Sequence, residues 1–191
     1  MKPVARTTPK GAVQAKAGSA QGLRDLFENG LKDIYYAEKA QAKSLQKMVQ
    51  NASSPELVNE LKNDLAVTKE QVSRLERVFK ASGLKASAKK CEAIDGIIRE
   101  TNGLLQLTAK GNVRDAGIIA SEQKAKHYEI ASFGTLHAYA KTLGEHGVAD
   151  LLATTLDVAK KTDIALTNIA VSAVNKQAWR ADAVTNLKKK L

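Results

Sequence analysis

Long runs of helical periodicity limit the fold of this sequence more than any other feature. Between about residues 21 and 175 the apolar residues recur mostly every three or four positions, which is the repeat of one helical face. Only one proline, Pro55, falls inside this region, because the other two are at positions 3 and 9. Nothing in the pattern requires a strand. We therefore expect an all-α protein.

Turn residues divide the region into long helices. Pro55 suits the first turn of a helix, where its missing N–H costs nothing. Gly83 and Gly144 suit helix ends, because glycine readily adopts the left-handed conformation of a C-cap. The expected long helices span about residues 21–51, 55–82, 112–143 and 145–175.

The segment from residue 84 to residue 111 is less regular and joins the second long helix to the third. Residues 91–100 within it can form a short helix. Two antiparallel hairpins joined by one long crossover are typical of the ferritin-like four-helix bundle. We therefore expect this architecture for residues 21–176.

The net charge of +10 is concentrated at the two ends of the chain. Residues 1–20 and residues 176–191 each carry a net charge of +4, which leaves +2 for the residues between them. We expect a disordered basic arm at residues 1–20 and a basic tail at residues 177–191. These ends serve either solubility alone or non-specific DNA contact. The residues predicted to contact such a polyanion are Lys10, Lys16, Arg180, Lys188, Lys189 and Lys190.

Cysteine content and hydropathy exclude several classes of protein. Cys91 is the only cysteine, so the chain has no intramolecular disulfide, thiolate zinc site or CxxC redox pair. No apolar run approaches the length of a membrane span, and none resembles a secretory signal. We expect a cytoplasmic protein that does not contact a membrane.

Charged residues fall on helix faces that should be buried. Glu38 lies four residues after Ile34 and seven before Leu45, which are both expected in the core. The third long helix has one face whose ends are apolar and whose middle is charged. This pattern predicts a polar band halfway along the bundle. The face consists of Ile119, Glu122, Lys126, Glu129, Phe133, Leu136 and Ala140.

A di-iron bundle needs two Glu-x-x-His motifs in addition to two further Glu residues. No Glu of this chain is followed three residues later by His. His127 and His137 share one helix but are ten residues apart, too far for one metal pair. Lys126 offers an alternative, because its positive charge can neutralise Glu38 and Glu129 as a metal would.

Several short blocks occur in the order found in a known family. They are LKDIYYAEK (31–39), SPEL (54–57), RLERVF (74–79), KCEAIDG (90–96), VRDA (113–116), HYEIA (127–131) and KKTD (160–163). With these blocks the sequence resembles the YciF/YciE-type family of bacterial, stress-associated, ferritin-like proteins over about residues 22–176. The resemblance implies a four-helix bundle, usually a dimer, linked to osmotic and general stress and without an assigned reaction.

The resemblance also implies where metal-binding carboxylates would lie. They fall on Glu38, on Glu70 in the region 67–70, and on Glu129. The family has Glu where this sequence has Val67, Lys126 and Ala159. We therefore expect a degenerate di-metal site, with Lys126 replacing the charge of a metal.

Three functional hypotheses follow from these observations. The first is a non-catalytic stress-response protein without a cofactor, acting as a homodimer. Its apolar association face includes Tyr35, Tyr36 and Phe133, unless these residues are ordinary core. The second is a di-iron oxidase or peroxide-scavenging enzyme that uses iron or manganese. The third is a stress protein that associates with DNA through its basic tails.

Overall fold

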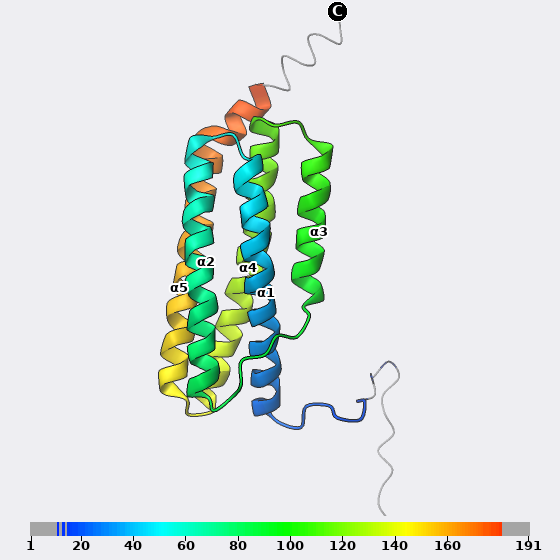
Figure 1. The fold of residues 1–191 in the computed structure, drawn as a ribbon, viewed down its shortest axis with the longest axis vertical. Helices are drawn as coiled ribbons and strands as arrows, with labels where there is room; N and C mark the ends of the chain where they lie inside the picture. The colour runs from blue at the N-terminus through cyan, green and yellow to red at the C-terminus, as the bar shows by residue number, and fades with distance from the viewer. Residues whose placement is uncertain (1–10, 12, 14, 181–191) are drawn as a thin grey trace, which may run out of the picture.

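In the part of the chain that the structure describes, five α-helices and one short π-helical segment form the body of the protein (Figure 1). The computed structural model describes residues 11, 13 and 15–180. No strand occurs in this described part, so the all-α prediction is confirmed. The elements are α1 (Leu23–Asn51), α2 (Pro55–Ala81), α3 (Glu92–Leu107), α4 (Asn112–Thr142), α5 (His146–Ile169) and the π-helical segment (Ala170–Val174).

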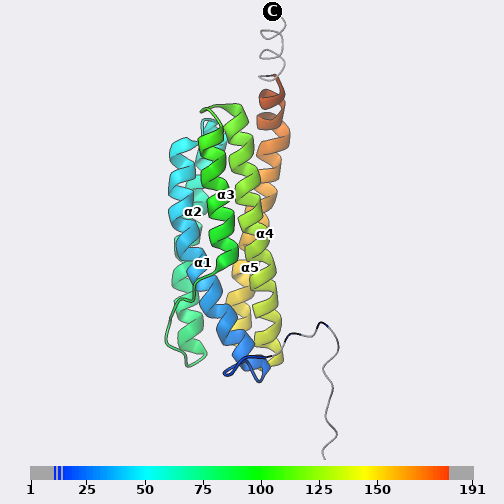
Figure 2. The same ribbon diagram turned by 90° about the vertical axis from the view of Figure 1, so that its right-hand side faces the viewer.

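The helices lie side by side as two antiparallel hairpins and one crossover helix. α1 pairs with α2 and α4 pairs with α5, while α3 runs along the side of the bundle against α1 and α4 (Figures 1 and 2). The predicted pair of hairpins with a long crossover is confirmed. The crossover helix is longer than the predicted range of residues 91–100. It has 16 residues and continues past Glu100 to Leu107.

The predicted helix ends are confirmed where turn chemistry is local. Gly83 follows α2 with a φ of 71°, and Gly144 follows α4 with a φ of 78°. Both values lie in the left-handed region that glycine adopts without steric cost. Ser54 caps α2 by accepting a hydrogen bond from the Leu57 N–H at 3.4 Å, and Pro55 is the first helical residue. Ser54 and Pro55 thus mark the turn of the first hairpin and Gly144 that of the second, while Gly83 ends α2 before the crossover to α3.

Asp115 on α4 ties the turn between α1 and α2 to the other hairpin. Its side chain is fully buried. Its two carboxylate oxygens accept hydrogen bonds from the backbone N–H groups of Ser53 and Ser54, each at 2.8 Å. These two donors belong to no helix, so the carboxylate satisfies groups that the turn would otherwise leave unpaired.

Replacing Asp115 with alanine should lower the free energy of unfolding by about 1–3 kcal/mol, because two backbone donors of the turn, one of them in the buried residue Ser54, lose their acceptor. Urea denaturation followed by circular dichroism measures this loss. Asp150→Ala is the control, since Asp150 is exposed on α5. An equal effect of the two substitutions would contradict a specific role for Asp115.

The apolar core consists of two clusters that lie toward opposite ends of the bundle. One includes Phe27, Phe79 and Phe133, and the other includes Leu45, Leu61 and Leu166. Phe133 is fully buried and Tyr35 is 7% exposed, so these two residues are ordinary core of the chain. The Tyr36 hydroxyl donates to Asp95 on α3. The predicted association face therefore does not include Tyr35 or Phe133.

Candidate functional site

Eight polar side chains lie between the two apolar clusters and form what we call the polar cluster. None of the eight residues is more than 1% exposed. The cluster draws on three helices, α1, α2 and α4. Its members are Glu38 and Gln41 from α1, Asp64, Thr68 and Gln71 from α2, and Glu122, Lys126 and Glu129 from α4.

Helical spacing explains why these side chains meet. Residues three or four apart project from the same face of a helix. Glu122, Lys126 and Glu129 follow this spacing on α4, and so do Asp64 and Thr68 on α2. The polar residues thus continue the apolar faces that pack the ends of the bundle, and the same packing buries them.

Lys126 is the centre of the polar cluster. Its ammonium Nζ donates hydrogen bonds to both carboxylate oxygens of Glu129, at 2.9 and 3.1 Å. The same atom forms an ion pair with Asp64 Oδ1 at 2.8 Å, but the angles of this contact do not meet those of a hydrogen bond. Nζ also lies 3.6 Å from Glu122 Oε1. Gln41 Nε2 donates to Glu122 Oε2 at 2.5 Å. One cation therefore serves three carboxylates from two helices.

Burial changes the protonation of this group of acids. Burial, reinforced by neighbouring carboxylates, raises the pKa of Glu38 and of Glu122 well above its usual range. Burial also raises the pKa of Glu129, and the Lys126 ammonium limits that rise, so the value is about 7. Burial alone would lower the pKa of Lys126, but the surrounding acids outweigh it and raise that pKa well above its usual range. Lys126 is therefore charged near neutral pH, and the raised pKa values of Glu38 and Glu122 favour the neutral forms of these two side chains.

Two members of the polar cluster, Glu38 on α1 and Gln71 on α2, make no internal hydrogen bonds through their side chains within the described structure. Both carboxylate oxygens of Glu38 and both side-chain polar atoms of Gln71 lack a hydrogen-bond partner among the described residues. An ionised carboxylate without a partner is costly to bury, and a neutral one is much less so. This environment agrees with the raised pKa of Glu38.

The donor set does not fit the pair of metal ions that the resemblance implies. Four carboxylates are present, but an ammonium already contacts three of them. A metal ion brought to these carboxylates would lie close to a buried positive charge, and the repulsion would be strong at low dielectric. On α5 the buried residue at position 159 is alanine, which offers no ligand atom. The described residues contain no group of three or more His, Cys, Asp or Glu arranged to hold a metal ion.

The structure brings together two of the three predicted metal-ligand residues. Glu38 and Glu129 are both in the polar cluster with Lys126. Glu70 is not, because its side chain is 71% exposed and forms an ion pair with Arg74 at 3.0 Å. The prediction that Glu70 belongs to the site is therefore wrong. The acid that α2 contributes is Asp64.

Sequence reasoning missed Asp64 and Gln41 as members of the cluster, and it did not assign a role to Glu122. The sequence does contain a pattern that predicts Asp64 in the cluster, because it shares one helical face with buried neighbours. The residues of this face are Leu61, Asp64, Thr68, Gln71 and Leu75. All five are buried.

The predicted polyanion contacts lie only partly in the described structure. Lys16 and Arg180 are exposed. Lys10, Lys188, Lys189 and Lys190 lie outside the described residues. DNA contact through the tails and homodimer formation therefore stay predictions.

Across the described part of the chain, every helix falls short of the length and apolarity that crossing a membrane would require.

Comparison with known proteins identifies close relatives. A family model described as a domain of unknown function, DUF892, matches residues 22–179. Protein YciF of Escherichia coli K12 is 41% identical over 157 residues, which cover 82% of this chain and 95% of YciF. The crystal structure of that E. coli stress protein has a TM-score of 0.79 at 40% identity, covering 82% of this chain and 99% of the other. YcfI from Rhodopseudomonas palustris, described as a candidate structural protein, gives 0.79 at 39% identity with the same coverage.

Proposed function

The chain belongs to the YciF-type DUF892 family, and on that basis we propose that it is a ferritin-like stress-response protein that acts without catalysis. The name of the E. coli relative supports the link to stress, and the description of YcfI supports a structural role. The proposal that the protein is not an enzyme is supported mainly by the position of Lys126 among the acids of the polar cluster.

In this proposal the polar cluster is a metal-type site converted into an internal ion-pair site. A di-metal centre in a helical bundle uses its carboxylates to balance two cations. Here the Lys126 ammonium takes one charge, within 3.6 Å of Asp64, Glu122 and Glu129. The raised pKa values of Glu38 and Glu122 favour their neutral forms, which lowers the negative charge of the cluster further. Much of the charge of the acids is therefore offset without a metal, and the bundle keeps its shape as a scaffold.

Metal analysis of the purified full-length protein tests this proposal. We expect far less than one equivalent of iron or manganese per chain by elemental analysis. Added Mn²⁺ should also leave the melting temperature unchanged, because only a ligand that binds the folded state raises it. About two equivalents per chain, or a clear rise in melting temperature, would overturn the assignment.

A kinetic assay separates the proposal from the enzymatic alternative. Ferrous iron is mixed with the protein, and its oxidation by oxygen or peroxide is followed. We expect the rate to equal that of a protein-free control. An acceleration that saturates with iron would show a working di-iron oxidase or peroxide scavenger instead.

A further inference from the structure

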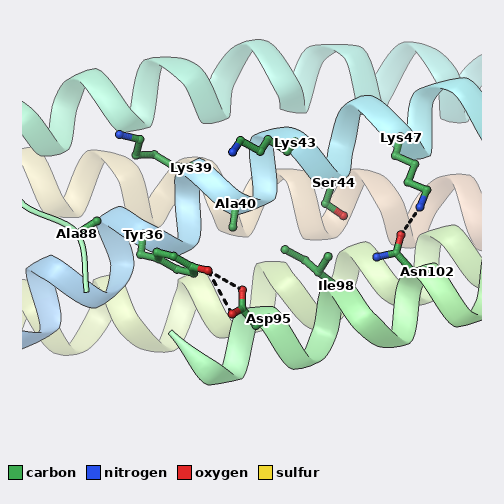
Figure 3. A pocket seen from close by; sticks show the side chains of 10 residues that line it. All are labelled: Tyr36, Lys39, Ala40, Lys43, Ser44, Lys47, Ala88, Asp95, Ile98 and Asn102. Atoms are coloured by element: carbon green, nitrogen blue, oxygen red, sulfur yellow. Dashed lines mark hydrogen bonds between the residues drawn. The ribbon is translucent and has the colours of Figure 1, made fainter. Parts of the chain in front are cut away.

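A basic hollow lies between α1 and α3, on the side of the bundle and separate from the polar cluster (Figure 3). It has a volume of about 510 Å³. Volumes of about 300–1,000 Å³ are typical of sites for small molecules. We call it the α1–α3 groove, and its principal lining residues are Lys39, Lys43 and Lys47 from α1 and Asp95, Ile98 and Asn102 from α3.

Three lysines form a row along one side of the groove. Lys39, Lys43 and Lys47 are four residues apart, so they recur on one face of α1 about every 6 Å and span roughly 12 Å. Like charges at this spacing repel each other and destabilise a helix. A row of this kind therefore carries a cost in stability that an anion would remove.

The charges of the three lysines are not taken up in ion pairs within the described part of the chain. None of the three lysines forms an ion pair there, whereas Lys90 and Lys124 both pair with acids. Lys39 lies 4.8 Å from the ring centre of Tyr35, and Lys47 donates to Asn102 Oδ1 at 2.5 Å. The groove thus presents three lysine charges that no ion pair neutralises in the described structure.

The one acid that lines the groove is already engaged. Asp95 accepts hydrogen bonds from the Tyr36 hydroxyl at 3.0 and 3.2 Å and lies 3.7 Å from Lys90 Nζ. It holds Tyr36 against α3, and Lys90 partly neutralises it. The net charge of the lining therefore stays positive.

The shape and polarity of the groove indicate the size of its ligand. Ala40 and Ile98 give it an apolar surface between the helices, as Figure 3 shows. Ala88 on the connection before α3 lies at one end, and the hydrogen bond between Lys47 and Asn102 lies at the other. A nucleic-acid strand would have to pass both ends, whereas a molecule of nucleotide size fits between them.

We propose that the α1–α3 groove binds a small phosphorylated organic anion of nucleotide size, with its phosphates along Lys39, Lys43 and Lys47. The less polar part of the ligand lies against Ala40 and Ile98. Lysine is a common phosphate ligand because its ammonium acts as a compact point charge. This site goes beyond the function proposed above, and it does not depend on whether the polar cluster binds metal.

Calorimetric titration of the full-length protein tests the site, with adenosine triphosphate and inorganic tripolyphosphate as probes. We expect saturable binding of one adenosine triphosphate per chain. The triple variant Lys39→Gln, Lys43→Gln, Lys47→Gln should bind it roughly tenfold or more weakly. Tripolyphosphate should bind more weakly than the nucleotide, because it has no part that contacts Ala40 and Ile98.

A matched variant controls for the change in net charge. Lys62→Gln, Lys69→Gln, Lys80→Gln removes three exposed lysines of α2, which do not line the groove. It should bind the nucleotide about as well as the unmodified protein. Circular dichroism should show both variants folded, because all six lysines are exposed.

Three results would overturn the proposal. The first is equal weakening by the two triple variants, which would indicate a general charge effect. The second is the absence of saturable binding of both probes. The third is lysine-dependent binding of a single-stranded oligonucleotide without binding of either small probe, which would make the groove a nucleic-acid site. Equal affinity for the two probes would overturn the role given to Ala40 and Ile98.

Discussion

Replacing Lys126 with methionine should lower the free energy of unfolding by about 3–5 kcal/mol, because it leaves buried carboxylates without their cation. Methionine keeps most of the volume of the side chain, so the loss reflects charge more than packing. Lys126 is only 1% exposed, and water therefore cannot replace the ammonium. Urea denaturation at pH 7, followed by circular dichroism, measures the effect.

Two further variants separate the role of the buried charge from that of any lysine on α4. Lys124→Met removes an exposed lysine that pairs with Glu100 on the surface, and it should cost less than about 1 kcal/mol. Adding Asp64→Asn and Glu129→Gln to Lys126→Met should recover much of the stability, because the orphaned acids become neutral. A loss at Lys126 no larger than at Lys124 would show that the ammonium does not hold the polar cluster together.

The helix ends were predictable where local turn chemistry sets them. Pro55, Gly83 and Gly144 act within one or two residues, so their effect is visible without the partner helices. The end of α3 was not predictable in this way. Gly96 and Gly103 lower its intrinsic helix propensity. Burial of Thr101 and Leu105 against the bundle, to 2% and 8% exposure, carries the helix on to Leu107.

The α4 part of the polar cluster was predictable because its charges interrupt one clear apolar face. The α2 part was not, because that helix carries two overlapping faces with the same spacing. One contains Leu65 and Val72, which look like core residues but are only half-buried. The other contains Asp64 and is the buried one. The choice between the two faces depends on how α2 rotates against α1 and α5, which is tertiary information.

The stability of the protein should fall as the pH rises from 5 to 7. In the unfolded chain, Glu side chains lose their protons near pH 4.5. In the folded protein Glu38 and Glu122 hold their protons to well above that pH, and Glu129 holds its proton to about pH 7. The native state thus binds more protons across this interval, and raising the pH then favours the unfolded state. Each such group contributes at most about 1.4 kcal/mol per pH unit.

Urea denaturation at pH 5, 6 and 7 should therefore show a total loss of about 2–3 kcal/mol or more. Lys126 does not oppose this trend, because its raised pKa keeps it charged throughout the interval. Glu129→Gln removes one titrating group and should make the pH dependence shallower, whereas Glu92→Gln, at a side chain 73% exposed, should leave it unchanged. A stability that rises from pH 5 to 7, as for proteins held together by ionised carboxylates, would mean that the acids of the polar cluster are buried as anions.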